Sequence, residues 1–298
     1  MAGGLAVCLC LTGLTACSQP GSAQPANELR FALDNISDVT ISYDEEAITF
    51  FQSDSNDLVI QEYMTENKES YYAKVDQHGS QIHISEGGKP FFKDNFHRYI
   101  EVYLPASYQE SLTVTTTDGD IDLSDMDLNL TSLRIDSTAG TVQLPYTAAT
   151  DVYLSSTSGT LNVGEIEADT IHLETTSGTV SCEELNGYVV YSSTSGDLEI
   201  KDAVGSGIYK ANNSGKLQVA YSEVSGDLYL FNKNDTIDLT LPENLAFRFV
   251  ATTKNGSVST TFQECVSIDG QTISGTVGID PAVTVEVETK NGDIQVNQ

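Results

Sequence analysis

The sequence predicts an all-β protein, a β-solenoid of about nine coils with an N-terminal β capping lobe. Three observations indicate this fold class. A glycine-centred motif returns every 18 to 21 residues from about residue 110 onward, the residues on either side of it alternate between apolar and polar, and the mature chain has no long segment of helical period. A repeat this short cannot bury its apolar face alone, so coils must stack and share one core.

Composition and charge indicate a folded protein and argue against nucleic-acid binding. The 298 residues include 43 Asp and Glu against 14 Lys and Arg, which gives a formal net charge of −29. Because phosphate binding needs a basic face, we expect no nucleic-acid partner. Hydrophobic residues make up 39% of the chain and Pro numbers only 7, which excludes a disordered acidic tail and a collagen-like or linker protein.

The N-terminus is typical of an exported lipoprotein, with a signal peptide over residues 1–17 and a flexible linker over residues 18–27. This stretch contains no Asp, Glu, Lys or Arg, and its apolar run is shorter than the about 20 residues that span a bilayer. The run ends Leu14-Thr15-Ala16-Cys17, which resembles the signal-peptidase motif of bacterial lipoproteins. That resemblance implies a lipid on Cys17 and an extracytoplasmic, membrane-anchored protein. An ordinary cleaved signal with a chance cysteine is the alternative.

Residues 28–105 form the predicted capping lobe. An open solenoid end exposes unpaired strand edges, which invite aggregation, so we expect this lobe to close the first coil. Short alternating segments predict its strands, at Val39–Tyr43, Ala47–Phe51, Leu58–Tyr63, Gln81–Ser85 and Tyr99–Leu104.

Residues 106–298 form the predicted solenoid. Its motif is a polar triplet, a Gly, one variable residue and two apolar residues at alternate positions, as in Ser156-Thr-Ser-Gly159-Thr-Leu-Asn-Val163. The residues seven and five positions before the Gly are also apolar, with Lys210 as the exception. Alternation with a period of two predicts two strands for each repeat, joined by a sharp turn at the Gly, where we expect a positive φ. The turn positions are Gly119, Gly140, Gly159, Gly178, Gly196, Gly215, Asp235, Gly256 and Gly292.

A weaker third side and the stacking order complete the predicted coil. Apolar residues seven and nine positions after the Gly, such as Ile166 and Ala168, predict that side. Coils that follow each other in the chain are expected to stack about 4.8 Å apart, which places Cys182 among aliphatic side chains and far from Cys265. The Ser and Thr residues before each Gly should hydrogen-bond the backbone of their own or a neighbouring coil.

The repeat resembles the bacterial DUF4097 family. The resemblance lies in the repeated T/S-x-S-G-x-[LVI]-x-[LVI], in Leu239-Thr-Leu-Pro242-Glu, and in the closing Glu288-Thr-Lys-Asn-Gly292-Asp-Ile-Gln-Val296. It covers roughly residues 30–298 and implies β-strand repeats on an exported protein. The family carries the label "putative adhesin", an association by fold that fixes no function. The resemblance supplies no catalytic residues.

Catalytic and metal motifs are sparse. The mature chain has no H-E-x-x-H, G-x-S-x-G, Walker, S-x-x-K or C-x-x-C motif, so the sequence predicts no enzyme and no cofactor. Asp118, Asp120 and Asp122 form a weak Ca²⁺ candidate, because Ca²⁺ takes about 6 to 8 oxygen ligands. A solvated acidic turn is the favoured interpretation of these three residues.

One candidate binding patch gathers cations and aromatics in an otherwise acidic protein. Such a combination can stack sugar rings or meet anionic polymers and lipid headgroups. The favoured alternative is structural, with the phenylalanines plugging the solenoid mouth and the cations lining its rim. The patch consists of Lys89, Phe91, Phe92, Lys93, Phe96, Arg98 and Tyr99.

These features predict a lipid-anchored cell-envelope solenoid with a non-catalytic binding or structural role. Its expected partners are the membrane, through the N-terminal lipid, and a cell-wall glycan, a host surface or a membrane protein. A membrane-tethered accessory or sensory protein of an envelope-stress response is the alternative. A carbohydrate-active enzyme is a distant third.

Overall fold

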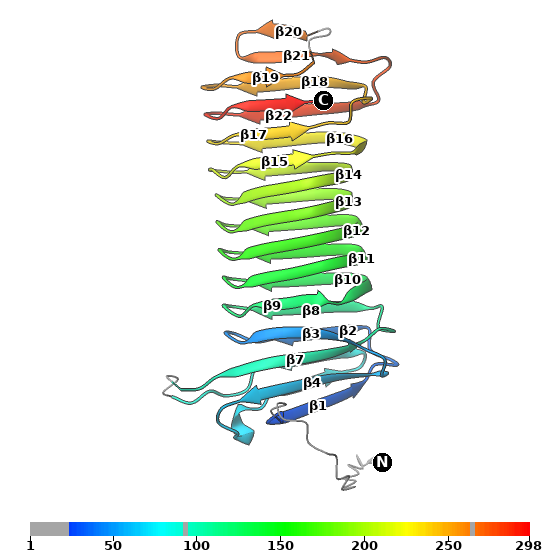
Figure 1. The fold of residues 1–298 in the computed structure, drawn as a ribbon, viewed down its shortest axis with the longest axis vertical. Coiled ribbons are helices and arrows are strands. Elements are labelled where there is room, and N and C mark those ends of the chain that lie inside the picture. The colour runs from blue at the N-terminus through cyan, green and yellow to red at the C-terminus, as the bar shows by residue number, and fades with distance from the viewer. Residues whose placement is uncertain (1–23, 92–94, 263–265) are drawn as a thin grey trace.

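The computed structural model describes residues 24–91, 95–262 and 266–298, and it shows a tall stack of short strands (Figure 1). Cys17 and Cys265 lie outside these residues, as do Phe92 and Lys93 of the candidate patch. In the described part, one turn of 3₁₀ helix, η1 (Glu69–Tyr71), is the only helical element. A search of the same residues for a helix with the length and apolarity to cross a membrane found none.

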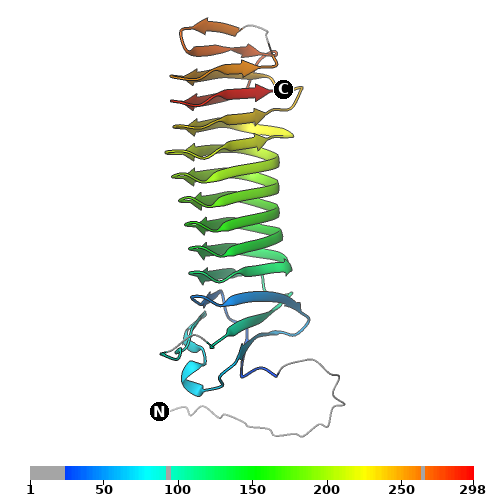
Figure 2. The same cartoon turned by 60° about the vertical axis from the view of Figure 1, so that its left-hand side comes forward.

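The central coils follow one another in space as they do in the chain. Four long strands each run from one turn to the next and pair in parallel with the strand above, so each coil is one continuous strand bent around the core (Figure 2). The residues of the expected third side, such as Ile166 and Ala168, are buried there. The predicted solenoid fold is confirmed. The strands are β11 (Thr141–Ser156), β12 (Thr160–Thr175), β13 (Thr179–Ser193) and β14 (Asp197–Ala211), with β10 (Asp127–Ser137) below them.

The core consists of aliphatic columns with equivalent residues stacked one above another. Cys182 pairs with Val163 below and Ile200 above, as predicted, and its side chain is fully buried and free of any disulfide. Burial of one such aliphatic side chain stabilises the fold by about 1.5–3 kcal/mol. Higher in the stack, the hydroxyls of Tyr209 and Tyr221 lie 2.6 Å apart inside the core, and burial raises the pKa of both.

The repeated glycine is required for close approach between coils. The residues Gly119, Gly140, Gly159 and Gly178 do not have a positive φ, so the expectation of left-handed backbone is wrong for them. A Cβ built on Gly159 would instead overlap the carbonyl oxygen of Gly140, directly below it in the stack. A side chain at this position would therefore push two coils apart.

The first residue of the polar triplet closes the turn from inside. The buried hydroxyls of Thr116, Ser156 and Thr175 each accept a hydrogen bond from the amide of the glycine three residues later, at 2.9, 2.9 and 2.8 Å. The expectation that these side chains bond the backbone is confirmed for these three coils, whereas the equivalent buried hydroxyl of Ser137 has no hydrogen-bond partner among the described residues.

One central coil departs from the register that the sequence indicated. Leu198 follows the buried Ser193 by five positions, whereas Leu217 follows the buried Ala211 by six, so the turn at Gly215 holds an extra residue. Gly215 accommodates it with a φ of 107°. Counting back from that glycine therefore misplaced the strand by one residue. Tyr209 and Ala211 face the core, while Ile208 and Lys210 face outward.

At the C-terminal end the spatial order of coils differs from chain order. The coil of Gly292 lies between those of Asp235 and Gly256, so the expectation that coils stack in chain order is wrong here. The coils are formed by β15 (Leu217–Ala220) with β16 (Glu223–Asn232) and β17 (Ile237–Thr240), then β22 (Val283–Thr289) with β23 (Ile294–Asn297), then β18 (Phe247–Thr253) with β19 (Val258–Thr260). After β17 the chain leaves space for one coil and forms β18 and β19 beyond it. The last two strands, β22 and β23, then occupy that space.

An antiparallel hairpin closes the C-terminal end of the stack. Its strands are β20 (Val266–Asp269) and β21 (Thr272–Val277), and β21 pairs with β18 (Figure 1). The hairpin thus pairs with the free edge of the last coil through antiparallel hydrogen bonds, and the parallel stack ends there.

The N-terminal end uses the same interleaving. A coil formed by residues 38–53 lies between the solenoid and the outermost coil, with Glu46 in the position that a glycine occupies elsewhere. The stack therefore extends into residues that the sequence assigned to the lobe. The inner coil is β2 (Asp38–Ser42) and β3 (Ala47–Ser53), which pair in parallel with β8 (Ser111–Thr116) and β9 (Ile121–Asp125) above and with β6 (Gln81–Ser85) and β7 (Arg98–Pro105) below.

Antiparallel strands cover the outermost N-terminal coil. The five segments predicted for this region all form strands, and the sequence missed two further ones at the edges. The covering strands are β4 (Asp57–Met64) on β7, β1 (Asn27–Ala32) on β4, and β5 (Lys74–His78) on β6.

Candidate functional site

The described residues of the candidate patch lie in the connection between β6 and β7 (Lys89, Phe91 and Phe96) and at the start of β7 (Arg98 and Tyr99). In the central coils a tight glycine turn joins the two sides of a coil, whereas here the connection spans residues 86–97, of which 86–91 and 95–97 are described, and its Lys89 lies beside Glu46. At the stacked turn position Glu46 bears a side chain, whereas nearly all the other coils have a glycine there. Lys89 from this connection and Arg98 from the start of β7 contact this carboxylate.

Arg98 is enclosed at the first position of β7. Its Nη2 donates to Oε1 of Glu46 at 2.9 Å and to Oε1 of Glu86 at 2.5 Å, and its Nη1 donates to the carbonyl of Tyr71 at 2.7 Å. The side chain is 0% exposed, and its guanidinium lies 5.9 Å from the ring centroid of Tyr43. A guanidinium with this many partners holds three segments of chain together.

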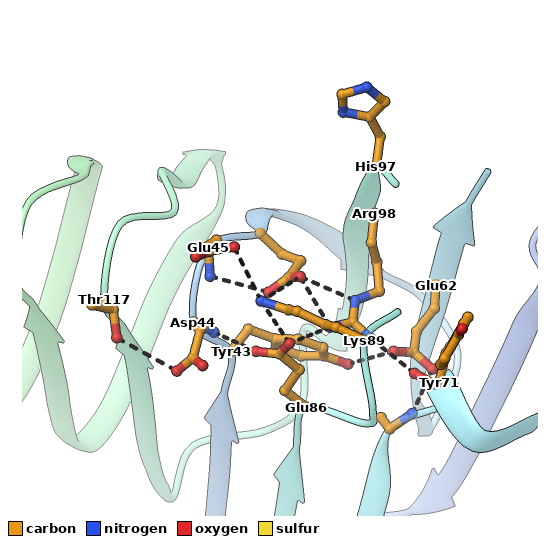
Figure 3. Close-up of polar contacts among 12 residues, drawn as sticks. Tyr43, Asp44, Glu45, Glu62, Tyr71, Glu86, Lys89, His97, Arg98 and Thr117 are labelled. Atoms are coloured by element: carbon orange, nitrogen blue, oxygen red, sulfur yellow. Dashed lines mark hydrogen bonds and ion pairs between the residues drawn. The ribbon is translucent and has the colours of Figure 1, made fainter. Parts of the chain in front are cut away.

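Lys89 completes what we call the ion-pair cluster, formed by Glu46, Glu86, Lys89 and Arg98. Its Nζ lies 2.7 Å from Glu86, 3.2 Å from Glu46 and 3.5 Å from Glu45 (Figure 3). Two cations therefore face two largely buried carboxylates. Removing one member would leave a buried charge without compensation.

A further buried carboxylate, Glu62, lies near the cluster. Glu62 is 0% exposed and accepts hydrogen bonds from Asn27 and from the amide of Ala73, both at 2.8 Å, and from the hydroxyl of Tyr43 at 3.3 Å. Burial, followed by the charge of Glu62, raises the pKa of Tyr43 well above its usual value, so the phenol stays protonated and remains a donor. This arrangement ties β1 to the rest of the lobe.

The aromatic residues of the patch point in different directions. Phe96 is half-buried and meets Tyr71 edge-to-face at 5.4 Å, while Tyr99 stacks on Tyr63 at 4.6 Å on the outer surface. Phe91 is 93% exposed. The structure thus brings Lys89 and Arg98 together in the interior, and it leaves Phe91 and Tyr99 on the surface.

Two of the three aspartates proposed for Ca²⁺ accept hydrogen bonds from the backbone. Asp120 accepts a hydrogen bond from the amide of Thr141 at 2.7 Å, and Asp122 accepts one from Ser124 at 2.9 Å. In the three described ranges, no group of three or more His, Cys, Asp or Glu side chains lies close enough to hold a metal ion. Asp118, Asp120 and Asp122 accordingly do not form such a group.

Comparison with known proteins identifies the family. The Toastrack DUF4097 family model matches residues 36–297, from just before β2 to the last strand. The chain belongs to this family. The match includes both interleaved ends, so these ends are part of the Toastrack fold along with the central repeats.

Solved structures similar to this Toastrack chain include the following three. A "putative adhesin" from Bacteroides fragilis is 12% identical, with 92% of this chain and 100% of that chain covered and a TM-score of 0.47. Another from Parabacteroides distasonis is 11% identical, with 91% and 96% covered and a TM-score of 0.48. A "putative cell adhesion protein" from Clostridium sporogenes is 9% identical, with 92% and 100% covered and a TM-score of 0.29. No curated protein matched the sequence.

A groove of about 780 Å³ runs along one corner of the Toastrack solenoid. Its floor contains Ala149, Ala168, Gly187 and Gly205, which pair across successive coils or lie directly above one another. A Cβ on Gly205 would overlap the carbonyl oxygen of Gly187, so this corner is a second line of close approach. The sequence indicated these positions as a buried third side, and their small size was the signal for a groove that sequence reasoning missed.

Proposed function

We propose that the protein is a lipid-anchored, non-catalytic binding protein of the cell envelope. The observation that carries this proposal is the position of the first strand: β1 lies at one end of the stack, and the β20–β21 hairpin caps the other end (Figure 1). A lipid on Cys17, joined through residues 18–27, would hold the β1 end at the membrane. The solenoid would then project away from it and present its long sides.

The contacts of the charged residues in the candidate patch favour a binding function over a catalytic one. Arg98 and Lys89, the cations that the sequence offered for a site, compensate the buried carboxylates of Glu46 and Glu86. Cations engaged in this way hold segments of the chain together and are not free to contact a substrate. The exposed members of the patch, Phe91 and Tyr99, are proposed contact residues at the membrane-proximal end.

The proposed partners are the membrane, through the lipid, and a component of the cell envelope or of a host surface. A net charge of −29 disfavours nucleic acid and anionic polymers in general. Capture of a protein from the same membrane, without binding to any external surface, would instead favour the accessory or sensory role.

The anchor is tested in cells that produce the full-length protein. We expect wild type to incorporate a labelled fatty acid and to fractionate with membranes, and the Cys17→Ala variant to lose both properties. Cys182→Val is the matched control, because this buried cysteine has no role in anchoring. Unchanged acylation of the Cys17→Ala variant would contradict the anchor.

The orientation is tested with an epitope tag at the C-terminus, near the capped far end of the stack. Intact cells that produce wild type should bind a tag antibody and should adhere to an isolated cell-wall or host-matrix fraction more than cells without the protein. A tag reached only after the cells are broken would contradict display at the surface.

A further inference from the structure

The two broad sides of the solenoid differ on their outer surfaces. After the turn, the central outward position is polar in every coil from β9 to β17, and we call this side the polar face. Its residues are Asp122, Gln143, Asn162, Ser181, Glu199, Gln218 and Asp238, which pair one above another.

On the opposite side, the matching position carries aromatic and aliphatic residues in five consecutive coils. We call them the outer stripe. The strand pairing stacks each of these side chains on the next, and all are half-buried although they face outward. The outer stripe consists of Tyr153, His172, Val190, Ile208 and Tyr229. Apolar groups lined up on an exposed face indicate an interaction site, whereas scattered ones do not.

Cations hold the rings at both ends of the outer stripe. The Arg134 guanidinium lies 4.0 Å from the ring centroid of Tyr153, and Lys210 lies 5.5 Å from that of Tyr229. The rings of Tyr153 and His172 are 6.1 Å apart, and the Tyr153 hydroxyl donates to Glu174 at 2.6 Å. These contacts orient the side chains before any ligand arrives, which lowers the entropy lost on binding.

Polar groups flank the outer stripe along most of its length. On one side the neighbouring outward positions are Asp151, Thr170, Tyr188 and Ser206, and on the other side they are Ser155, Glu174, Ser192, Lys210 and Phe231. The apolar surface is one residue wide except at Val190 and Tyr229, where Tyr188 and Phe231 widen it to two, and hydroxyls and carboxylates lie beside the rest. Tyr188 also lines the corner groove, so the polar edge continues into that groove.

We propose that the outer stripe binds a neutral, linear polysaccharide whose chain lies along the stack. This inference rests on the proposed binding function and names its site and partner class. Sugar rings have apolar C–H faces that pack on aromatic and aliphatic side chains, and their hydroxyls can donate to flanking carboxylates. A solenoid repeats the same contact in each coil, which suits a polymer with a repeating unit.

The net charge of the protein and the width of the outer stripe favour a neutral polysaccharide over an anionic polymer or a protein partner. A chain of net charge −29 repels anionic polysaccharides and a second copy of itself. A stable protein partner would need about 800 Å² on each side, with a fully desolvated core, and a stripe one to two residues wide does not supply such a core. A neutral chain with apolar faces and hydroxyl edges matches both the stripe and its flanks.

The test uses full-length protein in detergent with insoluble cellulose, chitin, curdlan and mannan, and with polygalacturonate as an anionic comparison. We expect wild type to bind at least one neutral polymer. The Tyr153→Ser/Tyr229→Ser variant should bind it on the order of tenfold more weakly, because two stacking contacts are lost. The matched control, Asn162→Ser/Asp238→Ser, changes the polar face of the same coils and should bind as wild type does.

A second readout follows the stripe directly. The chain contains no Trp, so Tyr153→Trp places the only tryptophan of the protein in the outer stripe, where its emission can be excited selectively over that of tyrosine. Adding a soluble oligosaccharide of the bound polymer should change its emission, whereas the same change at Asn162→Trp should stay silent.

Four outcomes would overturn the proposal: no binding of wild type to any of the neutral polymers, equal binding by the stripe variant, equal loss in both double variants, or stronger binding to polygalacturonate. A stripe variant that loses capture of a surface protein, with no polysaccharide bound, would also overturn it in favour of a protein partner. The anchoring test with Cys17→Ala and the surface test with the C-terminal epitope tag are independent of these results. A failure here therefore leaves the proposed function standing.

Discussion

The middle and the ends of the solenoid are built from the same coil but are connected differently. From β10 to β14 each strand pairs with the one that follows it in the chain. At each end, one coil is inserted between two others. At the N-terminal end, β2 and β3 lie between the coil of β8 and β9 and the outermost coil of β6 and β7. At the C-terminal end, β22 and β23 lie between the coil of β16 and β17 and the outermost coil of β18 and β19. The stability of a coil in the middle depends only on its contacts with the two neighbouring coils. An inserted coil in addition pairs with the outermost coil, on which the capping strands lie.

The two kinds of region are also stabilised by different contacts. The middle relies on aliphatic columns and on the close approach of glycines, which are the same in each coil. The N-terminal end relies on the ion-pair cluster, and the C-terminal end on Phe247, Phe249 and Phe262, whose rings meet edge-to-face at 5.0 to 6.1 Å. Each end is therefore stabilised by contacts that occur only once in the described part of the chain, whereas the coils of the middle repeat the same contacts.

The largest expected effect comes from removing one coil in each region. Deletion of residues 283–298 removes β22 and β23, so the outermost coil loses its parallel partner and the Phe247 cluster loses its support. We expect this protein to be insoluble or to unfold in more than one step. Deletion of residues 160–178 removes one whole repeat and rejoins Gly159 to Thr179, and this protein should remain soluble and cooperative.

Circular dichroism during heating, with size-exclusion chromatography, distinguishes the two deletions. If the central deletion proves as damaging as the terminal one, the coils are not interchangeable and the contrast between middle and ends is wrong.

The sequence carried enough information to predict the middle but not the order of the ends. The period, the turn glycine and the inward positions follow from local patterns, and strands such as β11 and β12 satisfy them one after another. The strands β18 and β22 carry the same apolar alternation, so pattern alone does not decide which of them pairs with β16. That choice depends on how far residues 241–246 carry the chain, which is a property of the folded structure.

Two features of the N-terminal end show the same limit. The coil around Glu46 fits the repeat, since Val39 and Ile41 precede it and Ile48 and Phe50 follow it at the expected spacing, but a Glu in the glycine position concealed it. The partner of that Glu, Arg98, is 52 residues away along the chain. No local pattern connects the two.

The ion-pair cluster gives the next largest effect. In the Arg98→Ala variant, Glu46 and Glu86 lose their buried partner, and we expect the free energy of unfolding to fall by about 3–5 kcal/mol. Lys201→Ala removes an exposed ion pair with Glu183 in the middle of the stack and should cause no measurable change. Urea denaturation of both variants measures the difference.

A neutralised partner makes this test more specific. Glu46→Gln added to Arg98→Ala removes one of the two stranded charges and should recover part of the loss. If the double variant is no more stable than Arg98→Ala, the loss comes from packing of the arginine stem and not from the buried charge.

The glycine column in the middle should respond by a smaller amount. In Gly159→Ala the new methyl group overlaps the carbonyl of Gly140, and we expect a loss of about 1–3 kcal/mol as the two coils shift apart. Gly226→Ala is the control, because a Cβ there would meet only the side chain of Ser206 at 3.1 Å, which can move. Equal effects of the two changes in urea denaturation would show that close approach is not what the column requires.

The smallest expected effect is at Cys182, in the aliphatic column of the middle. Cys182→Val conserves an apolar side chain of similar volume between Val163 and Ile200, so the free energy of unfolding should change by less than about 1.5 kcal/mol. Burial raises the pKa of the Cys182 thiol above its ordinary value of 9.0, which disfavours the thiolate in the folded protein. The stability that the neutral thiol contributes is therefore complete below pH 9.0 and is lost as the pH rises through the raised folded value. Alkylation mapped by mass spectrometry at pH 8 and pH 9 should leave Cys182 unmodified until denaturant is added, and rapid modification in the native protein would contradict the coil register that encloses it.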